Sequence, residues 1–146
     1  MKRIFVSLSF MLVAGSTTLF AGDKTDVNGK IKESFKKEFA GAESVRWDEV
    51  ESYQRATFLF HSRPVIAFFD EDGELLGSAR TVLYDQLPLT IIKSFDKRFA
   101  GAKFLEMYEI SNSEGTSYGI TFEKENERYH VKVNTNGNFL SSTKIK

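Results

Sequence analysis

The two histidines are the side chains of this chain best suited to acid–base chemistry near neutral pH. His61 lies beside the stretch Ser62-Arg63-Pro64, and His130 lies inside a run of alternating apolar and polar residues. Neither has a serine, cysteine or acidic partner in a recognisable nucleophile motif, and triad catalysis needs such partners within hydrogen-bonding reach. We interpret both histidines as solvated strand residues and assign no catalytic residue.

Acidic residues could instead hold a metal ion or act as paired acids. Residues 70–73, Asp-Glu-Asp-Gly, resemble the start of a calcium loop, but the twelfth position is Thr81 where such a loop has Glu. The similar segment 134–137 carries no charge, and a hairpin turn explains both segments. Solvated charge explains the other acids considered, which are Glu49, Glu51, Glu71 and Glu74. We therefore expect no metal, no cofactor and no enzyme activity.

The overall composition restricts the class of partner. Lysine and arginine together number 20, as do aspartate and glutamate. A neutral chain with interspersed charges lacks the basic surface that nucleic-acid binding requires, so we expect no nucleic-acid partner. The chain has no cysteine, so no disulfide can stabilise it. Its 14 phenylalanines, five tyrosines and one tryptophan supply large apolar side chains for a core.

The first 22 residues carry the pattern of a secretory signal peptide. Lys2 and Arg3 give a positive start, an apolar run follows at residues 4–14, and small residues surround Ala21. The apolar run is shorter than the roughly 20 residues of a membrane-spanning helix. We predict that residues 1–22 are cleaved, that no membrane association remains after cleavage, and that the protein is periplasmic or secreted.

Two pairs of similar segments recur in the same order along the chain. Residues 31–42 and 91–102 share two phenylalanines and the ending Phe-Ala-Gly-Ala, and residues 67–76 match residues 131–140 around a shared glycine. The two spacings differ by only a few residues, which a loop absorbs at little cost. Ordered internal similarity indicates duplication, and we predict two tandem repeats at residues 23–84 and 85–146.

Periodicity predicts the elements of each repeat. Apolar residues recur every four positions from Val27 to Phe39 and again up to Phe99, as on one face of a helix, and Gly41 and Gly101 follow as helix ends. A period of two then predicts antiparallel strands at residues 45–50, 55–61, 64–70, 75–82, 105–110, 118–123, 128–134 and 139–145. The expected fold class is α+β, with two tandem repeats that each consist of a helix followed by a four-stranded antiparallel sheet.

The order of these features resembles the PepSY-like family of small exported bacterial domains, which is related in shape to the β-lactamase inhibitor protein. The resemblance rests on the Phe-Ala-Gly-Ala helix ends, on Trp47, on a Phe-Asp-x-Asp-Gly turn and on the Leu87-Pro88 pair. Met107 and Tyr108 stand near the place of Trp47 in the second repeat. The resemblance implies helix-plus-sheet units whose sheets can line up into one continuous curved sheet with helices on one face, and a binding or inhibitory role.

The third predicted strand is apolar on both faces, although an uncovered face of an antiparallel sheet is usually polar. Alternate residues from Val65 to Phe69 are apolar in both repeats, so we assign them to the face under the helix. Ile66 and Phe68 then lie on the opposite face with Leu59, where exposed apolar residues indicate a contact surface. The candidate partner-binding residues, the last four at the rim, are Leu59, Ile66, Phe68, Trp47, Tyr53, His130 and Lys132.

These features predict an exported, non-enzymatic module that binds an unidentified exported protein or peptide as an inhibitor or regulator. The alternative is a small-ligand-binding protein with a pocket between sheet and helices, and an unrecognised hydrolase is a third hypothesis. The apolar face could instead be covered by the other repeat or by a loop. Edge strands at the ends of the sheet also permit a homodimer.

Overall fold

The computed structural model describes residues 26–145, and the predicted signal peptide lies outside the described residues. The helices are α1 (Gly29–Glu38) and α2 (Leu89–Arg98), with a short 3-10 helix, η1 (Tyr84–Gln86), before α2. Over residues 26–145, neither helix is long and apolar enough to cross a membrane. The strands are β1 (Glu43–Val50), β2 (Tyr53–Phe60), β3 (Arg63–Phe69), β4 (Leu75–Thr81), β5 (Lys103–Asn112), β6 (Gly115–Lys124), β7 (Glu127–Asn134) and β8 (Phe139–Ile145).

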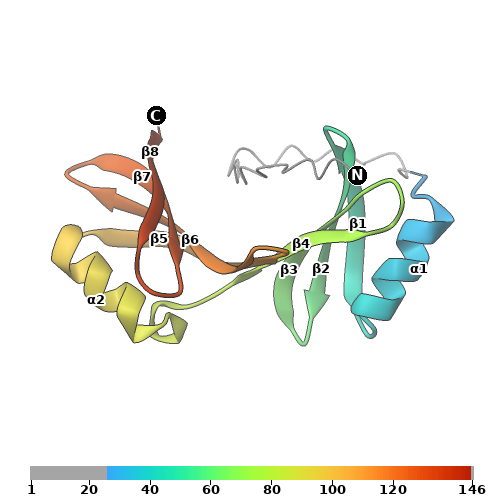
Figure 1. Ribbon diagram of the computed structural model, residues 1–146, viewed down its shortest axis with the longest axis horizontal. Helices are drawn as coiled ribbons and strands as arrows, with labels where there is room; N and C mark the ends of the chain where they lie inside the picture. Colours follow the sequence, from blue (N-terminus) through green and yellow to red (C-terminus); the bar gives the residue numbers. More distant parts are fainter. Residues whose placement is uncertain (1–25, 146) are drawn as a thin grey trace.

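The eight strands form one antiparallel sheet in chain order, with α1 and α2 at opposite ends of an elongated molecule (Figure 1). The predicted fold class, α+β with two repeats that each have a helix and a four-stranded sheet, is therefore wrong. Strands hold 54% of the described residues and helices 19%, so the molecule is mostly sheet. The physical reason is the pairing of β4 with β5, from Gly77↔Asn112 to Thr81↔Tyr108. This ladder satisfies backbone groups that two separate sheets would leave at their edges.

Both helices cover the same face of this sheet. The strand register places Val65, Arg80, Glu109 and Tyr118 in one row across β3, β4, β5 and β6. Directly paired residues of an antiparallel ladder lie on one face. Val65 belongs to the core under α1, and Tyr118 belongs to the core under α2. We call this side of the sheet the helix face.

Aromatic rings from both layers fill the two cores. The ring of Phe35 in α1 lies edge-to-face 4.9 Å from the ring of Phe58 in β2. The ring of Phe95 in α2 lies edge-to-face 4.9 Å from the ring of Phe122 in β6. Edge-to-face contacts of this kind stabilise aromatic pairs beyond the effect of area burial. The apolar stripes of the two helices thus bind each helix to its own part of the sheet.

Between the two cores, the helix face carries a polar network in place of a helix. Arg80 Nη2 in β4 lies 2.8 Å from Glu109 Oε1 in β5. Tyr118 donates a hydrogen bond of 3.1 Å to Glu109 Oε2, and burial together with the Glu109 carboxylate raises the pKa of Tyr118. The network adds side-chain contacts where the first four strands meet the last four.

Candidate functional site

The side of the sheet opposite the helices, here called the open face, carries Ile66, Ala79 and Ile110 in one row across β3, β4 and β5. Ala79 is 2% exposed and Ile110 is 3% exposed, so neighbouring side chains shield this row. Gly119 in β6 contributes no side chain, and a Cβ at Gly119 would lie 3.4 Å from Ile110 Cδ1. The middle of the open face therefore consists of small or shielded residues and is apolar.

A polar cluster continues the open face across the second half of the sheet. Glu106, Thr121 and His130 form one row, and Tyr108, Gly119 and Lys132 form the next. Sequence reasoning missed the β5 members of this cluster. The alternation of Glu106, Tyr108 and Ile110 in β5 was the signal that could have found them.

His130 lies at the centre of the polar cluster. Its Nδ1 atom and Thr121 Oγ1 are hydrogen-bonded at 3.0 Å. Burial lowers the pKa of His130, and the nearby Glu106 carboxylate acts in the opposite direction. Burial, and to a smaller extent Glu106, also raise the pKa of Tyr108. The folded protein therefore favours the neutral imidazole of His130.

The lowered pKa of His130 predicts a loss of stability in mild acid. The unfolded chain binds a proton at the ordinary histidine pKa of about 6.5, whereas folded His130 resists protonation until a lower pH. The free energy of unfolding should therefore fall as the pH drops through about 6.5. It should go on falling until the pH is below the pKa of His130 in the folded protein. In urea unfolding between about pH 7.5 and pH 5.5, His130→Gln should weaken this dependence.

The matched control for this experiment is His61→Asn, which changes the exposed histidine at the turn between β2 and β3. Asparagine tolerates the positive φ of 50° at this position. This variant removes the other histidine of the chain, so it separates a general effect of losing a histidine from the effect of the burial of His130. If the two variants showed the same pH dependence of the free energy of unfolding, the stability loss in acid would have another origin.

The structure brings all but one of the predicted partner-binding residues to the open face. Thr57 in β2 pairs with Ile66 in β3, which lies on the open face. Every second residue of β2 and β3, counted from these two, therefore lies on the open face as well. The pairing of Lys132 with Gly119 fixes the same side in β7. These residues are half-buried rather than fully exposed, and they are Tyr53, Leu59, Ile66, Phe68, His130 and Lys132.

Trp47 lies on the helix face instead. It pairs with Ala56, which is part of the core under α1. The ring centroid of Trp47 lies 5.2 Å from that of Phe35 and 5.9 Å from that of Phe69. The structure therefore makes Trp47 a partner of the α1 core and does not bring it to the rim of the open face.

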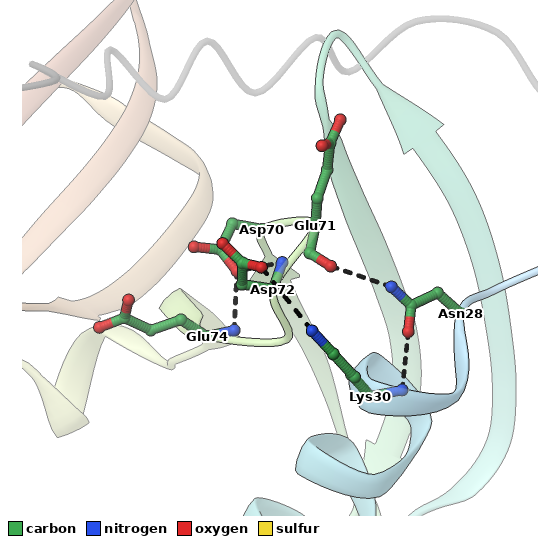
Figure 2. Close-up of polar contacts among 6 residues, drawn as sticks. All are labelled: Asn28, Lys30, Asp70, Glu71, Asp72 and Glu74. Atoms are coloured by element: carbon green, nitrogen blue, oxygen red, sulfur yellow. Dashed lines mark hydrogen bonds and ion pairs between the residues drawn. The ribbon is translucent and has the colours of Figure 1, made fainter.

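The acidic segment that resembles a calcium loop forms the turn between β3 and β4 (Figure 2). Asp70 Oδ1 accepts hydrogen bonds of 3.0 and 2.8 Å from the backbone N–H groups two and four residues later. Asn28 accepts a hydrogen bond of 2.7 Å from Lys30 N at the start of α1 and donates one of 2.9 Å to the carbonyl of Glu71. These side chains hold a hairpin turn and attach it to the helix.

The turn between β7 and β8 has the same arrangement without charge. Asn134 Oδ1 accepts two backbone hydrogen bonds of 3.0 Å, and Thr90 Oγ1 in α2 donates one of 2.7 Å to the carbonyl of Thr135. Both turns need a side-chain acceptor at their first position, which explains the aspartate without a cation. Within residues 26–145, no group of three His, Asp or Glu side chains lies close enough together to hold a metal ion.

Comparison with known proteins finds similar solved structures, but no match by sequence to a family model or a curated protein. No protein-family model matches the chain, and no curated protein matches it. A BLIP-like protein from Bacteroides fragilis NCTC 9343 superposes with a TM-score of 0.73 at 16% identity, over 81% of this chain and 86% of that protein. A DUF2874 family protein from Bacteroides ovatus ATCC 8483 gives a TM-score of 0.77 at 19% identity, over 84% and 89% of the two chains.

A third structure comes from Bacteroides eggerthii DSM 20697 and is provisionally described as a periplasmic protein. It has a TM-score of 0.77 at 18% identity, over 82% of this chain and 89% of that protein. Likeness at this identity shows the fold alone. It supports the part of the resemblance that concerned the β-lactamase inhibitor protein, while the PepSY-like assignment stays a prediction. The chain thus has a fold similar to that of BLIP-like and DUF2874 family proteins.

Proposed function

We propose that this chain is an exported, non-enzymatic module that binds another exported protein or a peptide through the open face, as an inhibitor or regulator. The observation that carries the proposal is that both helices pack on the helix face. The open face carries the half-buried apolar side chains of Leu59, Ile66 and Phe68 with neither helix over them, next to the shielded Ala79 and Ile110. Because an uncovered face of an antiparallel sheet is usually polar, these partly exposed apolar side chains favour a contact surface.

The size and charge of the open face favour a polypeptide partner. Strands lie roughly 4.8 Å apart, so the sheet extends about 30 Å or more across its eight strands. A surface of this extent suits the roughly 800 Å² per partner of an ordinary protein interface. Arg55 on one side of the apolar row, and Lys132 and Glu106 on the other, border it with both signs of charge. Such a border orients a partner during binding.

Two observations support export. Residues 1–22 carry the signal-peptide pattern, although they lie outside the described residues. A protein with the same fold is provisionally described as periplasmic. We therefore propose a periplasmic or secreted location, and we propose that residues 23–84 and 85–146 arose by duplication, as their matching segments suggest.

Site-specific photo-crosslinking in the producing organism tests the proposed function. A photoreactive amino acid at Thr57 or Lys132, both on the open face, should form a discrete adduct with one partner polypeptide. The matched control position is Lys93, which is exposed on α2 and should give no such adduct. Adducts of equal yield at Lys93, or no adduct at either open-face position, would contradict the proposal.

A further inference from the structure

A groove of about 330 Å³ lies between α1 and β1. Three aromatic side chains line it, from Phe35, Phe39 and Trp47. Lys32 and Lys36 also line it and stand one helical turn apart on α1. No ion pair joins either lysine to another residue in the described part of the chain. The groove therefore combines an aromatic wall with two uncompensated positive charges.

Tyr84 fills the corresponding position beside α2. Its ring centroid lies 4.7 Å from that of Phe104 in β5. Its hydroxyl donates a hydrogen bond of 3.2 Å to Asp96 Oδ1 on α2. Two residues before Tyr84, Val82 N donates a hydrogen bond of 3.0 Å to the carbonyl of Met107. This bond holds the segment that carries Tyr84 beside β5. This site holds an aromatic ring with a polar partner on the helix.

The helices supply the first reason to compare the two positions. In the two matching helical segments, Lys36 stands where α2 has Asp96, and Lys32 stands where α2 has Ile92. Ile92 packs against the core, while Asp96 accepts the hydrogen bond from Tyr84. At these two matched positions, α2 therefore has one negatively charged side chain and one apolar side chain, whereas α1 has two positively charged side chains.

The strands supply the second reason. β1 and β5 each have a register irregularity near their start. Val45 and Phe104 lie at these irregularities, and each packs against the core under its nearby helix. Phe104 is the ring that Tyr84 contacts, and Val45 lines the groove beside α1. Each site therefore has one core-facing side chain from the irregular start of its strand in its wall, and the two side chains lie one position apart in the matched segments.

We propose that the groove beside α1 binds an aromatic side chain of a partner polypeptide that has a carboxylate next to it. The aromatic lining accounts for the ring, because aromatic rings pack favourably edge-to-face or offset. Lys32 and Lys36 account for the carboxylate, because charge-assisted hydrogen bonds need an anionic acceptor. A volume of about 330 Å³ is small for a ligand site and suits one or two side chains. The groove lies on the helix face, so this site is separate from the open face.

Trp47 fluorescence reports directly on occupancy, because Trp47 is the only tryptophan of the chain and lines the groove. The probe is the peptide Gly-Asp-Phe-Asp-Gly with both ends blocked, titrated into the exported protein. We expect a saturable change in Trp47 emission. The peptides Gly-Asp-Ala-Asp-Gly and Gly-Lys-Phe-Lys-Gly, which lack the ring or reverse the charge, should give no saturable change over the same concentrations.

Charge reversal on α1 tests the role of the lysines. Lys36→Asp introduces the residue type found at the matching position of α2 and turns an attraction for the probe into a repulsion. It should weaken binding of the acidic peptide at least about fivefold. Lys37→Asp makes the same change at an exposed position of α1 outside the groove lining, and it should alter the affinity less than about twofold. Circular dichroism should match the parent protein for both variants.

Three results would overturn the inference. The first is the lack of any saturable change with the acidic aromatic peptide, and the second is equal weakening by Lys36→Asp and Lys37→Asp. The third is binding of phenylacetate as tight as that of the peptide, which would make the occupant a small aromatic acid. Lys36→Asp should leave crosslinking from Lys132 on the open face unchanged, so a failure here differs from a failure of the proposed function.

Discussion

Phe95→Ala is expected to lower the free energy of unfolding by about 3–5 kcal/mol, the range for truncating a buried phenylalanine. Phe95 is 1% exposed, and its ring centroid lies 4.8 Å from that of Phe104 and 4.9 Å from that of Phe122. The strands beneath it are hydrogen-bonded on both sides, so they cannot easily move into the cavity. Because a small domain has only about 5–15 kcal/mol of stability, urea unfolding should detect a large shift.

The control for this variant is Leu89→Ala in the same helix. Leu89 is 71% exposed, so its truncation removes little buried area and should change the free energy of unfolding by less than about 0.5 kcal/mol. Comparable losses from the two variants would mean that the stability of α2, rather than packing beneath it, decides the result.

Trp47 fluorescence in the same unfolding experiment tests whether the sheet unfolds as one unit. Trp47 packs in the core under α1, whereas Phe95 packs in the core under α2. The β4–β5 ladder and the ion pair of Arg80 with Glu109 join the two parts. We therefore expect fluorescence and circular dichroism to report the same lowered midpoint in Phe95→Ala. A fluorescence midpoint that stayed at the parent value would show that the two parts unfold independently.

Residue periodicity located the elements but could not show how they assemble. The predicted strand at residues 139–145 is β8, Phe139–Ile145, and the other predicted strands are present with ends that differ by a few residues. Such patterns depend on neighbours along one strand or helix. The pairing of β4 with β5 depends on backbone groups about 30 residues apart, as between Ala79 and Ile110. No periodic signal encodes that contact, and the predicted fold class was wrong for this reason.

The side on which Trp47 lies could not be read from the sequence, because β1 is irregular at its start. Its register shifts between Glu43 and Arg46, and Ser44 has a positive φ of 53°. An irregularity of this kind changes which side chains of a strand face inward. In β3, by contrast, Ile66 and Phe68 alternate without interruption with core residues, so their side followed from the sequence.

The apolar middle of the open face could not be predicted from the sequence, for the same reason as the fold class. Ala79 and Ile110 become neighbours only through the β4–β5 ladder, and the space above Gly119 matters only once Ile110 leans toward it. The groove beside α1 could not be singled out from the sequence either. Lys36 and Asp96 differ in charge, but Glu33 and Glu38 also stand where the second helical segment has Lys93 and Arg98, so only the structure shows which of these differences line the groove.

Gly137→Ala is expected to destabilise the protein by about 2–5 kcal/mol, as the sum of a backbone cost and a steric cost. Gly137 has a φ of +83°, a conformation that costs an L-residue roughly 1–2 kcal/mol. An added Cβ would also lie 2.6 Å from the carbonyl oxygen of Thr90 and 2.5 Å from Ser94 Oγ. Since the Thr90 carbonyl belongs to the backbone of α2, the turn or the helix must shift to relieve the contact.

Gly101→Ala separates the two contributions, because Gly101 has a φ of +77° but no atom within 4 Å of an added Cβ. It should lose only the backbone contribution, about 1 kcal/mol, in urea unfolding. The excess loss in Gly137→Ala then measures how firmly the β7–β8 turn presses on α2. Equal losses would mean that this turn rests loosely on the helix. A large excess would show that the β7–β8 turn packs tightly against the start of α2 and holds it in place. The turn that the hydrogen bonds of Asp70 hold is attached to the start of α1 in a similar way, through the hydrogen bond that Asn28 donates.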